Sequence, residues 1–210
     1  MLRPSSSWAF GSPKAEEGWQ EYLQSQAEPV LSVIYHIIEQ TLSGKMMPYG
    51  FQIASRAMHW YADAVRDSNI ETRLVKCATA VECLIFPEQG KATSTFVIRG
   101  ALFAQRQGSP MKHWAAVARK LYRQRSAVAH GDLETLMSFR GDSTSEALEF
   151  TRNVILQFLA FCVHLQPIGI QQGTKQDFLE LYQQCEAGFS KEIDEIVKTH
   201  KFNKWKCVPP

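Results

Sequence analysis

Residues 111–131 read MKHWAAVARKLYRQRSAVAHG, which is the pattern of one long amphipathic helix. The apolar side chains recur three and four positions apart, the spacing of one face of an α-helix, and they are Trp114, Val117, Ala118, Leu121 and Val128. Pro110 precedes the stretch, where proline suits a helix start, and Gly131 follows it, where glycine ends helices. We therefore expect a helix from about Met111 to Ala129.

The same spacing recurs on both sides of this stretch. It predicts helices over 15–26, from Pro29 to Ser43-Gly44, and over 51–67, 70–86, 143–166 and 174–199. Segment 93–106 is either a helix or a strand, because β-branched residues cluster there. Ser143 and Glu146 form a capping-box pattern, and 132–142 reads as a loop with room for one helical turn. With no alternating strand pairs and no hairpin dipeptide, the fold class is an all-α bundle.

The chain divides into four regions by composition. Residues 1–14 are rich in serine and proline and are expected to be poorly ordered, and 15–50 form a helical extension. Residues 51–167 form the main helical domain, and 168–210 hold a C-terminal helix and a basic-aromatic tail. That tail, Lys198 to Lys206, either grips phosphates and stacks on bases or is an ordinary soluble terminus.

Length and composition exclude several classes of protein. The chain has 210 residues, of which 45% are hydrophobic, so it can bury a sizeable core. No apolar run reaches the roughly 18 residues that span a bilayer, and the start lacks a signal-peptide pattern. The five cysteines include no Cys-x-x-Cys pair, so we expect reduced thiols. These features predict a soluble, cytoplasmic protein without a membrane anchor.

The formal net charge of +2 hides a segregated charge distribution. No acidic residue lies between Gln89 and Gly131, and the rest of the chain carries a net −6. This acid-free segment holds eight cations: Lys91, Arg99, Arg106, Lys112, Arg119, Lys120, Arg123 and Arg125. Uncompensated, such a segment attracts polyanions. We expect Arg119, Lys120 and Arg123 to form a solvated face that steers RNA.

The acid-free segment ends in an arginine and a histidine suited to RNA chemistry. Histidine can take the proton of a ribose 2′-hydroxyl or donate one to the leaving 5′-oxygen, and a guanidinium can bind phosphate oxygens. Arg125 falls on the apolar stripe, and His130 stands at the helix end. Residues five apart on a helix differ in direction by about 140°. The two side chains can therefore converge only if the last turn distorts or if a second copy of the chain contributes.

The Arg-x(4–6)-His spacing alone is weak evidence for a site. The chain has 11 arginines and 6 histidines, and it contains three such matches, from Arg125 and Arg123 to His130 and from Arg106 to His113. No phosphate-binding loop, dinucleotide motif, zinc motif or serine-hydrolase motif is present. We therefore expect no cofactor and no metal.

Three blocks of sequence belong together. They are Leu121-Tyr122-x-x-Arg125-Ser126-x-x-x-His130-Gly131, the stretch from Arg73 to Ile85 with Ala80-Val81-Glu82-Cys83-Leu84, and Ile98-Arg99-Gly100-Ala101-Leu102. Taken together, they resemble the HEPN superfamily, specifically its ApeA-like branch. The resemblance covers about residues 51–166. It implies a HEPN-like helical bundle that forms a homodimer, with the Arg-x4-His motifs of two copies in one composite cleft.

Active members of this family are metal-independent endoribonucleases, often in phage defence or toxin–antitoxin systems, and their products carry 2′,3′-cyclic phosphate ends. The resemblance implies that Arg125 contacts phosphate and that His130 is the general acid or base. Ser126, Tyr122, Glu82 and Arg99 would support the site. RNA is the implied substrate, and an antitoxin or regulatory protein is a further implied partner.

Other interpretations of the same residues remain open. Arg125 and His130 could belong to a catalytically inactive helical dimer that binds RNA or a protein partner, or to one subunit of a nucleotidyltransferase pair. Glu82 lies on an otherwise apolar helix, and we expect it to form a buried salt bridge with Arg99 or Arg73.

Overall fold

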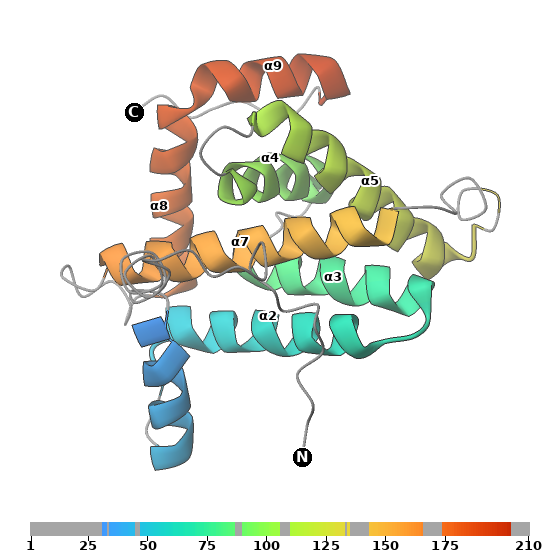
Figure 1. The fold of residues 1–210 in the computed structure, drawn as a ribbon. Helices are drawn as coiled ribbons and strands as arrows, with labels where there is room; N and C mark the ends of the chain where they lie inside the picture. The colour runs from blue at the N-terminus through green and yellow to red at the C-terminus, as the bar shows by residue number, and fades with distance from the viewer. Residues whose placement is uncertain are drawn as a thin grey trace, which may run out of the picture.

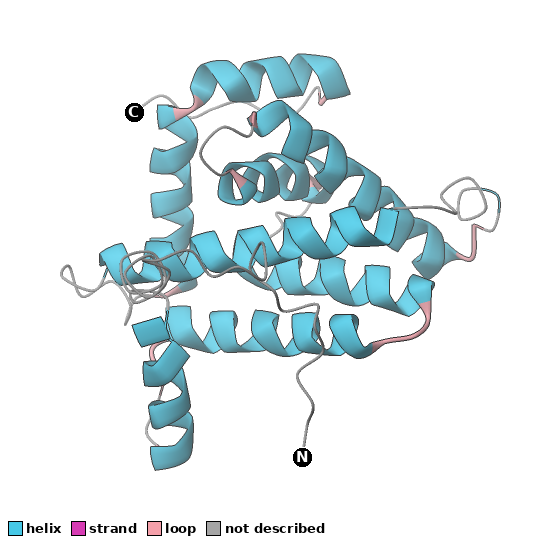
Figure 2. Cartoon of the chain, viewed as in Figure 1, coloured by secondary structure: helices cyan, strands magenta, loops and turns pink. Residues whose placement is uncertain are grey.

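The computed structural model describes residues 31–32, 34–44, 47–86, 90–105, 110–132, 134, 143–165 and 174–202. Within these ranges every regular element is a helix and no strand occurs, which confirms the all-α class (Figure 2). Residues 31–32 and 34–43 form a helix that we call the N-terminal helix. The helices that follow are α2 (Tyr49–Arg66), α3 (Ile70–Ile85), α4 (Ala92–Ala104), α5 (Met111–His130), α7 (Ser143–Leu165), α8 (Lys175–Gly188) and α9 (Ser190–His200).

The predicted helices match these bounds to within two residues in most cases. The segment around 93–106 is a helix, so the strand alternative is wrong. The predicted helix over 15–26 and most of the 132–142 loop lie outside the described residues, as does the Ser143 side chain of the capping-box pattern.

The predicted helix over 174–199 is in fact two helices that meet at Phe189. Phe189 has φ −115° and ψ 26°, which is not helical geometry, and Gly188 before it is a weak helix former. The break turns the chain, and α8 and α9 run in different directions (Figure 1). The turn lets Ile193 and Ile196 bury on α9, while Phe178 and Tyr182 bury on α8.

Helix α7 lies at the centre of the bundle and contacts α2, α3, α4 and α5 (Figure 1). Its fully buried phenylalanines, Phe150 and Phe158, pack with aromatic rings from α4, α5 and α8. The approach of α4 to α7 requires Gly100, because a Cβ atom there would lie 2.8 Å from Cζ of Phe150. The core therefore depends on a close helix crossing as well as on apolar burial.

The connection from α2 to α3 is fixed by side-chain hydrogen bonds. The Asn69 side chain accepts from the backbone N–H groups of Glu71 at 2.8 Å and Thr72 at 3.1 Å, which caps α3. Asp67 accepts from Nζ of Lys76 at 2.6 Å and from Oγ1 of Thr72 at 2.7 Å. These bonds hold α3, which carries Glu82, in register against α2.

The described cysteines are free, and no described helix is long and apolar enough to cross a membrane. Burial raises the pKa of Cys77 to about 11 and that of Cys162 to about 12, so both thiols stay protonated at neutral pH.

Candidate functional site

The end of α5 that carries Arg125 and His130 is closed by a regular C-terminal cap. Gly131 adopts φ 67°, in the left-handed region, and its N–H donates to the carbonyl of Val128. The N–H of Asp132 donates to the carbonyl of Ala127 at 2.9 Å. This pair of bonds is a Schellman motif, which glycine allows because it has no Cβ atom. Helix α5 therefore stays helical through His130 and then ends sharply.

Arg125 is held between α3 and its own helix. Its Nη2 lies 3.4 Å from Oε2 of Glu82 on α3, a single and rather long contact. Its guanidinium also lies over the ring of Tyr122, 5.9 Å from the centroid, which is cation–π range. The Arg125 side chain remains 34% exposed. Since a guanidinium has five N–H donors and Glu82 engages one nitrogen, donors remain for another anion.

The ring beneath Arg125 is itself anchored in the core. Tyr122 packs against Phe96 with centroids 5.0 Å apart, and Phe96 packs against Phe150. Both phenylalanines are fully buried. A rigid aromatic stack thus runs from the centre of the bundle to Arg125, and it limits the positions that the guanidinium can take.

The His130 side chain is exposed and makes no hydrogen bond or ion pair with the described residues. It lies five residues from Arg125 on an unbroken helix, so the two Cα atoms are about 7.5 Å apart along the axis and their side chains diverge by about 140°. A single copy of the chain does not bring the two side chains together. Ser126, next to Arg125, is half-buried and makes no side-chain hydrogen bond within the described residues.

Glu82 pairs with Arg125, so the expected salt bridge from Glu82 to Arg99 or Arg73 is wrong. Arg73 bends back to the backbone carbonyl of Asp67. Arg99 on α4 forms an ion pair with Glu186 of α8 instead, with Nε of Arg99 2.6 Å from Oε1 of Glu186. Burial raises the pKa of the Glu82 carboxyl above its ordinary value, and the charge of Arg125 limits that rise.

Arg99 is a buried structural residue rather than part of the Arg125 site. Its side chain is 1% exposed, and its Nη1 donates to the carbonyls of Ile85 at 3.1 Å and Phe86 at 3.3 Å. Its guanidinium also faces the ring of Tyr182 at 5.5 Å. Together with Glu186, Arg99 therefore joins the end of α3 to α4 and α8.

The fold gives three cations of the acid-free segment a carboxylate partner. Lys120 pairs with Glu146 of α7 at 2.8 Å, in addition to the pairs of Arg99 and Arg125. Arg119 donates from Nη1 to Nδ1 of His200 at 2.7 Å and to the carbonyl of the same residue at 3.1 Å. Arg123 is exposed and also takes part in an interaction within the fold. The expectation of an uncompensated segment is therefore wrong at Arg99, Lys120 and Arg125, which pair with carboxylates.

Sequence reasoning missed the partners Glu146, Glu186 and His200. They lie 26, 87 and 81 residues from the cations that they contact. No periodicity or motif links residues at those separations, because the packing of α7, α8 and α9 against α4 and α5 creates the contacts.

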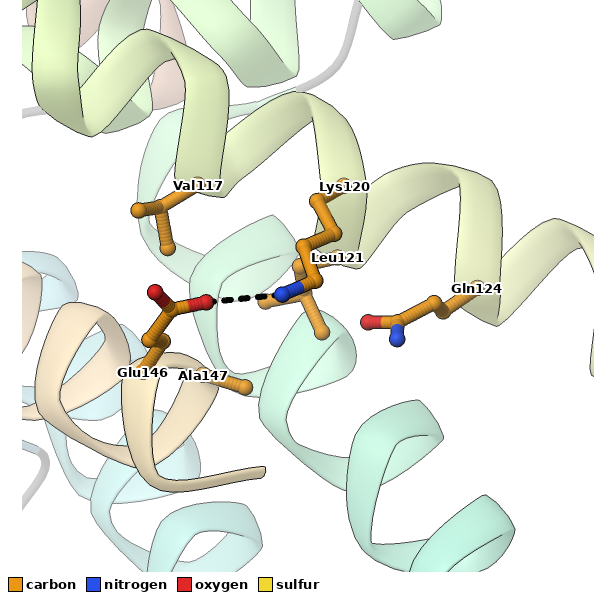
Figure 3. Close-up of a pocket in the computed structure, with 6 residues that line it drawn as sticks. All are labelled: Val117, Lys120, Leu121, Gln124, Glu146 and Ala147. Carbon is orange, nitrogen blue, oxygen red and sulfur yellow. Dashed lines mark hydrogen bonds and ion pairs between the residues drawn. The ribbon is translucent and has the colours of Figure 1, made fainter. Parts of the chain in front are cut away.

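A shallow pocket between α5 and α7, lined by neither Arg125 nor His130, leaves no room for a ligand. Figure 3 shows its six lining residues, with the Lys120–Glu146 ion pair across its mouth and Gln124 beside it. Gln124 is 1% exposed, and its Nε2 has no hydrogen-bond partner among the described residues. The described residues contain no group of three or more metal-ligating side chains.

Comparison with known proteins gives no match, because no family model, curated protein or solved structure resembles this chain significantly.

Proposed function

We propose that this chain is a metal-independent endoribonuclease in which Arg125 and His130 act in a cleft shared by two copies. The observation that carries the proposal is the state of these two side chains. Arg125 is oriented by Glu82 and Tyr122 yet keeps free donors, and His130 is exposed with no partner among the described residues. An oriented guanidinium suits phosphate binding, and an accessible imidazole suits proton transfer.

The requirement for a second copy follows from the regularity of α5. Because α5 stays helical to His130, its own Arg125 and His130 diverge. The end of α5 from a second copy can place its His130 next to Arg125 of the first. A twofold arrangement then creates two equivalent pairs at one interface. The partner implied by the HEPN-like resemblance is therefore a homodimer, with RNA as substrate.

The proposed reaction is an attack within the RNA chain. A histidine takes the proton of the ribose 2′-hydroxyl, and the 2′-oxygen forms a bond to the adjacent phosphorus. The bond from phosphorus to the 5′-oxygen breaks, and that oxygen gains a proton to become a 5′-hydroxyl. Arg125 binds the non-bridging phosphate oxygens, whose charge grows in the transition state. The products carry 2′,3′-cyclic phosphate and 5′-hydroxyl ends, and DNA does not react because it has no 2′-hydroxyl.

The test is cleavage of a single-stranded RNA by the purified full chain in EDTA. His130→Ala and Arg125→Ala should each lower the rate by about 100-fold or more. His113→Ala is the matched control, because His113 is also an exposed α5 histidine and belongs to another of the three spacing matches. Full activity in His130→Ala, with an unchanged helical CD spectrum, contradicts the proposal.

The composite cleft has its own test, which mixes the two inactive variants. A dimer of one Arg125→Ala chain and one His130→Ala chain keeps one intact Arg–His pair. After the subunits exchange, half of the dimers are mixed, and each mixed dimer keeps one of its two sites intact. About a quarter of the activity of the unaltered chain should therefore return. If no activity returns although the chains exchange, each site lies within one chain.

A second candidate function, a non-catalytic helical dimer that binds RNA or a protein, is favoured by the ion pairs of Arg125 and Lys120. It predicts binding without turnover. Binding of RNA phosphates weakens steeply with salt, whereas an apolar protein interface is less sensitive. If the chain cleaves RNA in cells, we expect an antitoxin or regulatory protein to restrain it.

A further inference from the structure

The N-terminal helix carries an apolar stripe that faces solvent. Four large side chains on this helix, which we call the outer stripe, are 57%, 68%, 50% and 83% exposed, and they are Leu31, Tyr35, Ile38 and Leu42. Exposed apolar residues that occur singly are normal on soluble proteins, but a contiguous patch marks an interaction surface. The outer stripe is such a patch within the described residues.

The outer stripe does not attach the N-terminal helix to the bundle. A different face makes that attachment: Ile37 is 4% exposed in the core, Ile34 packs against the core, and His36 contacts the ring of Phe51 with centroids 5.5 Å apart. At 100° per residue, the centre of the outer stripe lies about 130° around the helix from Ile37. The N-terminal helix stands away from the other helices at one end of the molecule (Figure 1). A second protein can therefore reach the stripe without disturbing the core.

The spacing of the stripe predicts a helix as its partner. Successive members are four, three and four residues apart, and they fall within about 60° of the helix circumference. This narrow seam with a 3.5-residue repeat is the pattern by which helices pair side by side in coiled coils. A broader apolar face, by contrast, is typical of helices that pack on a globular core.

The order of residues in the outer stripe is nearly the same in both directions, so the stripe can pair with the same stripe of a second copy. The four positions are symmetric about a point between His36 and Ile37, with leucine at both ends. In an antiparallel pair, Leu31 lies opposite Leu42 of the other copy and Tyr35 lies opposite Ile38. An interface between identical chains related by a twofold axis needs this self-complementarity.

The charges beside the stripe permit the same pairing. The flanking positions hold Ser32 and Glu39 on one side and Ile34 and Thr41 on the other. In the antiparallel arrangement Glu39 faces Ser32 of the other copy, so no like charges meet. We propose that the outer stripe binds the outer stripe of a second copy as an antiparallel helix pair.

The seam is short, so the pairing is weak. A stable interface buries about 800 Å² on each partner, over 20–30 residues, whereas the stripe offers four side chains on about three helical turns. We therefore expect a dissociation constant in the micromolar to millimolar range. The C-terminal end of α5 lies at the opposite side of the molecule from the N-terminal helix (Figure 1). The stripe is thus a second interface, separate from the proposed cleft, and a chain that uses both forms assemblies larger than a dimer.

Sedimentation velocity over a roughly 100-fold range of concentration tests the proposal with the full chain. Leu42→Glu should weaken the association by about 100-fold, because it places an unpaired carboxylate against the apolar side chain of Leu31 in the other copy. Ile70→Glu is the matched control, since Ile70 is a 57% exposed apolar residue on α3, away from the stripe. If the proposed cleft also forms, Leu42→Glu reduces larger assemblies to dimers. If Leu42→Glu leaves the association unchanged, the proposal is overturned. This holds whether residues 1–30 or another protein covers the stripe instead.

A cross-linking experiment tests the orientation without reference to RNA cleavage. One kind of chain carries Leu31→Cys and the other carries Leu42→Cys. The two kinds are given different masses so that a gel distinguishes their products, and they are then mixed and oxidised. The antiparallel pair predicts disulfides between the two kinds of chain. Disulfides that join only chains of the same kind would show parallel pairing and contradict it. His130→Ala added to both chains should leave the result unchanged, so failure of the nuclease proposal and failure of this one are distinguishable.

Discussion

Breaking the buried ion pair between Arg99 and Glu186 should destabilise the protein more than any exposed ion pair can. The two side chains are 1% and 8% exposed, and Nε of Arg99 lies 2.6 Å from Oε1 of Glu186. Removing one partner of a buried pair typically costs 3–5 kcal/mol, because the other charge has lost its compensation in a poorly solvated place. Methionine replaces each side chain by an apolar one of similar length, so packing is largely kept.

The size of each effect follows from the bonds that are lost. Arg99→Met removes the ion pair and the bonds to two backbone carbonyls, and we expect a loss of about 4 kcal/mol in the free energy of unfolding. Glu186→Met removes the ion pair but leaves the two carbonyl bonds of Arg99, and we expect a loss of about 3 kcal/mol. The double variant holds neither charge, so it should lose only about 4 kcal/mol. The coupling between the two positions is then about 3 kcal/mol.

The assay is urea unfolding at pH 7, followed by far-UV CD, for the unaltered chain, both single variants and the double variant. Lys120→Met is the control, because Lys120 and Glu146 form a pair at 2.8 Å whose side chains are 37% and 46% exposed. We expect it to cost at most about 1 kcal/mol. The reasoning fails if Arg99→Met costs no more than Lys120→Met, or if the double variant loses the sum of the single losses.

Three further outcomes are expected. Gly100→Ala should cost about 1–2 kcal/mol, since its Cβ atom would lie 2.8 Å from Cζ of Phe150 and overpacking exceeds the gain in helix propensity; unchanged urea unfolding would show that the helices can separate freely. Burial and the charge of Arg119 lower the pKa of His200. The contribution of His200 to the free energy of unfolding is therefore full above pH 6.5 and declines as the pH falls below that value. His200→Asn should remove this part of the pH dependence, measured by urea unfolding between pH 7 and 5. Hydrogen bonds, first that from Lys76, hold the pKa of Asp67 far below its ordinary value. Asp67 therefore stabilises the folded protein fully above pH 4, and this stabilisation is lost on further acidification. The Asp67→Asn variant should unfold more easily at neutral pH and show a flatter acid transition by CD.

Local patterns in the sequence predicted the helices because the signals for a helix are themselves local. The apolar spacing of 111–131 and the glycine after it predicted α5, and Gly131 closes that helix as expected. The break at Phe189 was missed because a single glycine, Gly188, is a weak signal inside an otherwise helical pattern. The turn there arises from the separate burial of Tyr182 on α8 and Ile193 on α9, which depends on where α4 and α5 lie.

The N-terminal helix was predicted from apolar residues that serve two different faces. Ile37 is buried, whereas Ile38 and Leu42 are exposed. Spacing shows that both sets can lie on a helix, but it cannot show which set has a partner within the chain. That distinction needs the position of α2, whose Phe51 contacts His36 on the inner side.

The contacts of the candidate site were less predictable than its residues. Sequence reasoning selected Arg125, His130, Tyr122 and Glu82, and the structure brings three of them together while His130 stays apart. The partner of Glu82 could not be chosen from the sequence, since Arg73 lies on the same helix and Arg99 and Arg125 lie on neighbouring helices. Only the rotation of α4 about its axis, which turns Arg99 toward α8, leaves Arg125 as the partner of Glu82.

The ion pairs of the acid-free segment change how RNA would be recognised. An uncompensated segment with eight cations would attract RNA from a distance and bind it with a steep dependence on salt. With Lys120 paired to Glu146 and Arg125 paired to Glu82, the field at long range is weaker. If RNA binds while these pairs persist, few counterions are released, and the logarithm of the binding constant falls gently with the logarithm of salt concentration. If phosphates displace Glu82 and Glu146, the slope steepens by roughly 0.7 for each cation engaged on a single strand. The salt slope therefore reports whether the carboxylates stay in place, and Glu82→Gln should change it only if Glu82 is displaced.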